Sequence, residues 1–214
     1  MLLGVIVTQK IFFTSEAIVE AGFALTREKG WGAVSARSIA KKLGSSTMPI
    51  YSTMKSMEEI ERLVRARAES LLSDYQRRPY TENLVQNLAI GYVAFARDEK
   101  NLFHFLFVDR PVAADLEDGG EGARDTLGAR AADAAAGQLA GDTRFSLQDP
   151  RVLKSWIFTH GMASLVGGGV LDLSDDKIRD LLLEAGGAFF LYEEDKIKRA
   201  RPGAAQGDRG GTNE

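Results

Sequence analysis

The chain has 214 residues, of which 44% are hydrophobic and 27% are charged, a balance that is ordinary for a globular protein with a substantial buried core. It has no cysteine and only two histidines, which excludes disulfides and thiolate metal sites and leaves too few ligands for a histidine-built metal site unless carboxylates join them. The formal net charge of −3 is uneven, since residues 1–57 carry seven Lys/Arg against three Glu and the remainder carries twenty against twenty-seven Asp/Glu.

The basic first segment is typical of a surface that binds phosphates, although such an excess is also a common fluctuation. The opening residues 1–7 are apolar, but they are too few for a membrane helix and lack the positive region of a signal peptide. We therefore expect a cytoplasmic protein with no membrane partner.

Apolar residues recur at helical spacing along the whole chain, and no alternating run of β-branched residues marks a sheet, so the sequence predicts an all-α fold. A first helix is expected from about Thr14 to Lys29, ended by Gly30. Ser35 is placed to cap a second helix with Ile39, Ala40 and Leu43 on its buried side, and Gly44 suits a left-handed exit.

The third predicted helix covers residues 46–54, with Ser46 as its N-cap and Pro49 in its first turn, where a missing N–H costs nothing. Ile50 and Met54 point inward, one turn apart. A fourth helix opens at the capping box Ser56 to Glu59 and runs to Pro79.

The C-terminal half predicts longer, more apolar helices. We expect a helix over 82–97 with Leu84, Leu88 and Phe95 inward, a short aromatic helix over 102–108, a flexible acidic loop at 117–122 and an alanine-rich helix over 124–140. Asp149-Pro150 opens a further helix towards Gly167, and Ser174 caps a last one with an apolar side at Ile178, Leu181, Leu182, Ala185 and Phe189. The Pro/Gly-rich tail is expected to be disordered.

Two capped helices joined by a tight turn, with a short and outwardly polar second member, are what a helix-turn-helix needs to enter the major groove of DNA. The alternative is an accidental turn between structural helices. Residues 14–64 resemble the DNA-binding domain of the TetR family of transcriptional regulators, through Ala17-Ile18, Ala21-Gly22, Leu25, Glu28-Lys29-Gly30, the run Val34 to Gly44, and Ile50-Tyr51. The sequence departs from the family at Met54, where an aromatic residue is usual, and at Met57, where a phosphate-binding lysine is usual.

The C-terminal half resembles the family's regulatory domain named for its Trp-His-Gly residues, through Tyr92 to Arg97, Asn101 to Phe107, and Trp156 to Gly161. The resemblance implies a helix-turn-helix domain at 1–57 and a helical ligand-binding and dimerisation domain at 58–200 that pairs through its last two long helices. The composition adds a disordered tail at 201–214.

The resulting hypothesis is a homodimeric one-component regulator, a repressor that binds a pseudo-palindromic double-stranded DNA operator and is released by a small-molecule effector. Thr47, Met48 and Pro49 would touch base edges and Arg37 would support them, while Ser46, Tyr51 and Lys55 would meet phosphates. Ser52 is a further DNA-binding candidate on the outward face of the same helix. Since Met57 replaces a phosphate contact, the alternative is a helical small-molecule sensor with a weakened DNA-binding head. No nucleophile, base and orienting group stand at a usable spacing for an enzyme, and no cofactor is expected.

Each candidate ligand residue has two interpretations. His104 is either a core histidine or a ligand contact that senses pH, and His160 either bonds an effector or forms a buried polar pair. The aromatic candidates Phe103, Phe107 and Trp156 are either core or pocket wall.

Overall fold

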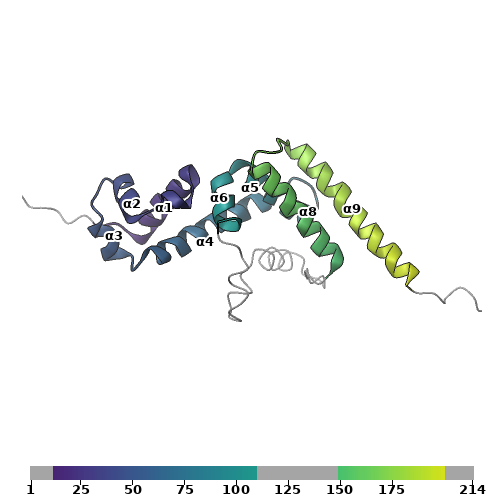
Figure 1. Ribbon diagram of the computed structural model, residues 1–214, viewed down its shortest axis with the longest axis horizontal. Helices are drawn as coiled ribbons and strands as arrows, with labels where there is room; N and C mark the ends of the chain where they lie inside the picture. The colour runs from purple at the N-terminus through teal and green to yellow at the C-terminus, as the bar shows by residue number, and fades with distance from the viewer. Residues whose placement is uncertain (1–11, 110–148, 201–214) are drawn as a thin grey trace, which may run out of the picture.

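The computed structural model describes residues 12–109 and 149–200, drawn in colour in Figure 1. Within these segments every regular element is helical, which confirms the predicted all-α fold. The molecule is elongated, with α1 to α3 at one end and α9 at the other (Figure 1). The apolar start at 1–7, the acidic loop at 117–122, the alanine-rich helix at 124–140 and the tail at 201–214 were predicted for parts of the chain outside the described residues.

The predicted helix boundaries at this end are largely confirmed. Helix α1 spans Ser15–Lys29, and its N-cap Thr14 accepts the N–H of Ala17 through its side chain. Helix α2 spans Ala36–Lys42, capped by Ser35, whose hydroxyl accepts the N–H of Ser38. Gly30 and Gly44 take φ values of 79° and 67°, which favour glycine at both exits. A short 3₁₀ helix, η1 at Trp31–Ala33, lies between them.

Helix α3, at Met48–Thr53, is shorter than predicted. The prediction that Ser46 caps it is wrong: Thr47 is the N-cap, in helical backbone conformation and without a side-chain capping bond. Pro49 does lie in the first turn. The turn after α2 therefore uses one more residue than the hydroxyl pattern indicated, because Ser45, Ser46 and Thr47 are all plausible caps by residue type.

The three short helices share one core with α4, which spans Met57–Gln76. Four isoleucines of this core are at most 1% exposed, namely Ile18, Ile39, Ile50 and Ile60, and Met54 is 2% exposed. Helix α4 continues beyond this core, and its buried side chains Ile60, Val64, Ala68 and Leu72 recur every four residues along one face. The boundary predicted between residues 57 and 58 falls in its first turn, in a helix that packs on both parts of the chain.

Helix α5, at Leu84–Asp98, is the centre of the C-terminal part and contacts α4, α6, α8 and α9. Helix α6 spans Lys100–Phe107, α8 spans Pro150–Gly167 and α9 spans Asp175–Arg199. The predicted caps Asp149 and Ser174 are confirmed, since their side chains accept the N–H groups of Arg151 and Lys177. Leu84 was predicted to point inward but is 46% exposed, because the helix starts there and Asn83 is its cap.

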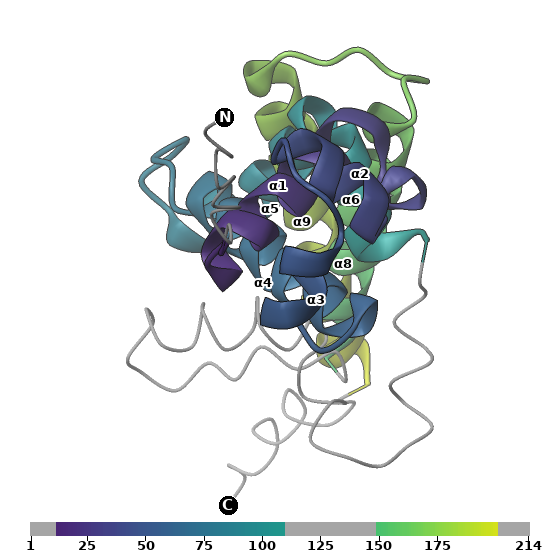
Figure 2. The ribbon, with the colours of Figure 1, turned by 90° about the vertical axis from the view of Figure 1, so that its left-hand side faces the viewer.

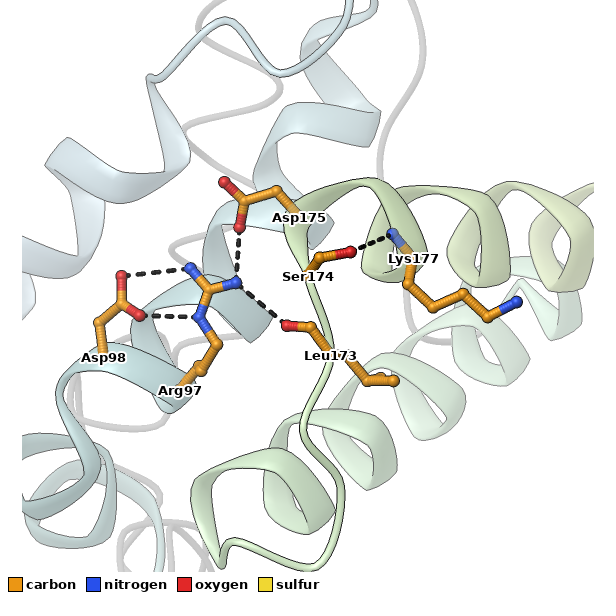
Figure 3. A network of polar contacts seen from close by, with 6 residues as sticks. All are labelled: Arg97, Asp98, Leu173, Ser174, Asp175 and Lys177. Atoms are coloured by element: carbon orange, nitrogen blue, oxygen red, sulfur yellow. Dashed lines mark hydrogen bonds and ion pairs between the residues drawn. The ribbon is translucent and has the colours of Figure 1, made fainter.

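Arg97 fixes the end of α5 to the start of α9, as Figure 3 shows. Its guanidinium donates to Asp98 at 2.8 Å, to the carboxylate of Asp175 at 2.7 Å and to the carbonyl of Leu173 at 3.2 Å. These acceptors raise the pKa of Arg97, with the hydrogen bond to Asp98 as the largest cause, so the group stays charged. No helix in the described part of the chain is long and apolar enough to cross a membrane.

Gly91 permits the close crossing of α4 and α5. A Cβ built there would lie 2.5 Å from the carbonyl oxygen of Tyr75 and 2.6 Å from the Cα of Gln76, both backbone atoms that cannot rotate away. We therefore predict that Gly91→Ala lowers the free energy of unfolding by about 1–3 kcal/mol, measured by urea denaturation. The matched control is Gly186→Ala in α9, whose Cβ would meet nothing within 4 Å and which should stabilise its helix by up to about 1 kcal/mol. Equal stability of the two variants would contradict the close crossing.

Candidate functional site

Helix α3 presents a mixed outer surface at the end of the molecule. Figure 2 views the molecule from this end, with α1, α2 and α3 in front of the other helices. Met48 is 76% exposed and Tyr51 is 60% exposed, while Ile50 is fully buried between them. Thr47 and Pro49 are half-buried and Ser46 and Ser52 are exposed. The structure thus brings the predicted outward side chains to one surface and anchors them from below.

Hydrogen bonds restrict this surface in two places. The hydroxyl of Ser52 donates to the carbonyl of Pro49 at 2.8 Å, so it is engaged as a donor within the helix. The hydroxyl of Thr53 donates to the carbonyl of Phe13 at 3.1 Å, which ties α3 to the segment before α1. The side chain of Thr47 makes no hydrogen bond to any described residue, so both its donor and its acceptors remain available.

Four exposed cations lie on or beside α2 and α3: Arg37, Lys41, Lys42 and Lys55. None of them forms an ion pair with another described residue, whereas Arg27 and Lys29 at the end of α1 are both paired. Among the described cations of α1 to α3 and the turns beside them, those without an ion-pair partner therefore lie on α2 and directly after α3, which suits the binding of phosphates.

The start of α4 differs from the predicted capping box in one bond. The hydroxyl of Ser56 accepts the N–H of Glu59 at 3.2 Å, as expected. The carboxylate of Glu59, however, accepts the N–H of Lys55 at 2.7 Å instead of that of Ser56. The Ser56 hydroxyl also lowers the pKa of Glu58, so this helix start carries acidic side chains.

A polar contact that the sequence analysis missed joins the α1 end to the rest of the molecule. Glu99, at the corner between α5 and α6, has a side chain only 4% exposed and pairs with Arg27 of α1 in a two-point contact, with Arg27 Nε 2.7 Å from Oε2. Asn101 donates to the carbonyl of Arg27 at 3.0 Å, and Trp31 stacks on Phe105 at 5.0 Å between ring centroids. Since these partners are more than 70 residues apart, helical spacing gave no signal for them.

Four of the five predicted ligand residues form an aromatic cluster around Tyr92: Phe103, Phe107, Trp156 and His160. The Tyr92 ring lies 5.3–5.7 Å from those of Phe107, Trp156 and Phe103, and Trp156 stacks on His160 at 5.6 Å. Tyr92 is 1% exposed, whereas Phe107, Trp156 and His160 are half-buried, so one side of the cluster is accessible. Tyr92 lies in one of the motifs of the C-terminal half but was not predicted to be a site residue.

His104 lies outside this cluster. Its side chain is exposed, so the interpretation of His104 as a core histidine is wrong. The residue faces away because Phe103 and Phe105, its neighbours on either side, take the buried positions of α6. It touches the cluster only at the edge of Phe103, at 6.5 Å between ring centroids.

Burial sets the protonation of the polar pair in the cluster. The hydroxyl of Tyr92 lies 2.9 Å from Nδ1 of His160. Burial raises the pKa of the Tyr92 phenol and lowers the pKa of the His160 imidazole, so the neutral forms of both are favoured. With the phenol as donor, the imidazole proton lies on Nε2, which becomes the hydrogen-bond donor available to a ligand.

The lowered pKa of His160 predicts a loss of stability in mild acid. The unfolded chain binds a proton at His160 more readily than the folded protein, so this contribution is present above about pH 6.5 and is lost as the pH falls. Urea unfolding of the wild type and of His160→Phe should therefore give free energies that converge between pH 7.5 and pH 5.0. The control is His104→Phe, an exposed position outside the cluster. If the free energy of unfolding of the wild type and of His160→Phe falls by the same amount over this pH range, the lowered pKa of His160 is contradicted.

The comparisons with known proteins agree with this architecture. Residues 85–187 match the family model of the Tetracyclin repressor-like C-terminal domain, which takes in α5, α6, α8 and half of α9. A solved structure described as a TetR-like transcriptional regulator from Rhodococcus sp. RHA1 is similar in fold, with a TM-score of 0.57 and 16% identity, over 82% of this chain and 94% of that one. No curated protein sequence matches the chain. Residues 85–187 therefore match a Tetracyclin repressor-like C-terminal domain, and the chain shares the overall fold of a TetR-like transcriptional regulator.

Proposed function

We propose that the chain is a cytoplasmic homodimeric repressor that binds a pseudo-palindromic operator and leaves it when a small molecule binds the C-terminal domain. The C-terminal domain model that it matches is Tetracyclin repressor-like, and the solved structure that it resembles is a TetR-like transcriptional regulator. The single observation that best supports DNA binding is the combination of an exposed α3 surface, held by buried Ile50, with cations on α2 and α3 that have no partner among the described residues.

The exposed side chains of α3 suit the reading of base edges. Thr47 keeps a free hydroxyl that donates or accepts, and the exposed thioether chain of Met48 and ring of Pro49 suit contact with thymine methyl groups. Arg37 on α2 supports them with a mobile charge. Each correctly formed contact of this kind discriminates against a wrong base by about 1–3 kcal/mol.

The remaining predicted residues suit phosphate contacts, which set register rather than sequence. Tyr51 and Lys55 are exposed donors, and Ser46 keeps an exposed hydroxyl. Ser52 contributes less than the others, because it must release the Pro49 carbonyl before it can donate to a phosphate oxygen.

Helices α8 and α9 carry the apolar surface for the second copy. Leu153, Ile157 and Gly161 follow at four-residue spacing on α8, all exposed, with Ile157 at 61%. On α9, Leu191 is 69% exposed and Tyr192 is 61% exposed. Exposed apolar stripes on two neighbouring helices are typical of a surface that is buried in an oligomer.

The aromatic cluster around Tyr92 is the proposed effector site. It offers apolar walls, one accessible side and a histidine nitrogen oriented by Tyr92. An effector bound there would act through α6, which carries Phe103 and Phe107 and also contacts α1. The shift that it causes in DNA binding cannot exceed its difference in affinity for the two states of the dimer.

One observation favours the alternative function, a small-molecule sensor whose helix-turn-helix domain binds DNA only weakly. The start of α4 carries Met57 where the family usually has a lysine, and next to it stand Glu58 and Glu59. Carboxylates at this helix start repel a phosphate that the helix dipole would otherwise attract. Lys55, which is exposed and unpaired, is the proposed replacement for the missing cation.

Variants of α3 separate base reading from phosphate binding in mobility-shift titrations. Lys55→Ala and Tyr51→Phe should weaken binding to all DNA sequences alike, and Lys55→Ala should flatten the slope of log affinity against log salt by about 0.9. Thr47→Ala should instead relax the preference at one base position. The control is Lys177→Ala, an exposed cation on α9. Equal loss on every sequence after Thr47→Ala would contradict its base-reading role.

The proposed pairing of α8 and α9 is tested by Ile157→Arg. A buried arginine without a partner opposes association, so this variant should sediment as a monomer and bind operator DNA at least tenfold more weakly. Leu84→Arg places the same charge at an exposed leucine on α5 and should leave the sedimenting species unchanged. If the Ile157→Arg variant still sediments as a dimer, this face of α8 is not the dimer interface.

A further inference from the structure

A second concave site lies between α5, α8 and α9. It is a groove of about 500 Å³, within the range of small-molecule pockets in proteins. On α8 it is lined by Ser155, Phe158 and Thr159, whereas Trp156 and His160 of the aromatic cluster project from another side of the same helix. The groove is therefore a site separate from the proposed effector cluster.

The walls of the groove are apolar. Ile90 of α5 is 1% exposed, and Phe158 of α8 packs edge-on against Phe189 of α9 at 6.2 Å between ring centroids. None of the fourteen lining residues carries a charge. A charged ligand would lose its hydration here without gaining a counter-ion, so the lining favours a neutral molecule.

Three neutral polar side chains line the groove and form no side-chain hydrogen bond with another described residue. Gln86 of α5 and Ser155 and Thr159 of α8 all line it, and no described residue forms a hydrogen bond with any of these side chains. Thr159 is only 6% exposed. Its hydroxyl oxygen is not among the fully buried atoms that lack a partner, so the small exposed part of the residue includes this oxygen, which is accessible to a ligand in the groove.

Gly186 keeps the groove open on the α9 side. It lies inside a long helix, where glycine is unfavourable, and its conformation is not one that requires glycine. A Cβ at this position would meet nothing within 4 Å, so close packing within the chain does not require it either. The effect of glycine at this position is to leave space in the groove.

We propose that this groove binds a neutral, mainly apolar small molecule that forms one or two hydrogen bonds, with Thr159 as a bonding partner in the interior. The site does not depend on operator binding or on the aromatic cluster, so it is tested in the absence of DNA. Its ligand class is defined by an uncharged lining and by polar groups that either donate or accept.

The test uses the full chain and two probes with the same aromatic skeleton. N-phenyl-1-naphthylamine is neutral with one N–H donor, and 8-anilinonaphthalene-1-sulfonate adds a negative charge to it. The neutral probe should bind saturably, at one molecule per protomer, and the sulfonate at least tenfold more weakly. Gly186→Leu should weaken the neutral probe at least tenfold by filling the groove, with circular dichroism and sedimentation unchanged.

Two further variants keep the test decisive. Thr159→Val removes a hydroxyl that has no partner among the described residues, so the fold should be retained while the neutral probe binds about three- to tenfold more weakly. Tyr92→Phe alters the aromatic cluster and should leave the affinity unchanged. The proposal is overturned if the wild type shows no saturable binding, if Thr159→Val and Gly186→Leu both bind like the wild type, or if only Tyr92→Phe loses the probe.

Discussion

The outer surface of α3 depends on two buried side chains, Ile50 and Met54. A helix of six residues is too short to be stable on its own, so its position is set by what it packs against. Ile50 is fully buried and Met54 is 2% exposed, in the same core as Ile39 of α2 and Ile60 of α4. The orientation of Met48 and Tyr51 is a consequence of that anchorage, because a helix turns by about 100° per residue and both side chains project from other sides of α3 than Ile50. Met54, where the family usually has an aromatic residue, fills this role with a flexible side chain that adapts to the available space.

This end of the molecule is also held by the C-terminal part. Helix α4 runs through both, and the pair between Arg27 and buried Glu99 fixes the end of α1 to the corner before α6. Helix α6 in turn supplies Phe103 and Phe107 to the cluster around Tyr92. A ligand that moves α6 therefore acts on α1 through direct contacts. This gives the proposed release from DNA a physical route, which the groove between α5, α8 and α9 does not share.

Local features of the fold were predictable from the sequence, whereas long-range pairings were not. The caps at Ser35, Asp149 and Ser174 depend on a few adjacent residues, and so they were predicted correctly. The cap at Ser46 was wrong because three consecutive hydroxyl residues compete there. The interpretation of His104 as a core residue was wrong because its aromatic neighbours Phe103 and Phe105 occupy the buried positions of α6. The bonds of Tyr92 with His160 and of Arg27 with Glu99 join residues 68 and 72 positions apart, for which a single sequence gives no spacing signal.

The central claim is that two copies of α3, each held on its own core, read one duplex together. The most direct measurement is selection of bound fragments from a random-sequence DNA pool by the full chain, followed by sequencing. We expect enrichment of two inverted half-sites, with centres separated by about 10–10.5 base pairs or a multiple of it. Enrichment of no sequence, or of a single half-site without an inverted partner, would contradict this claim.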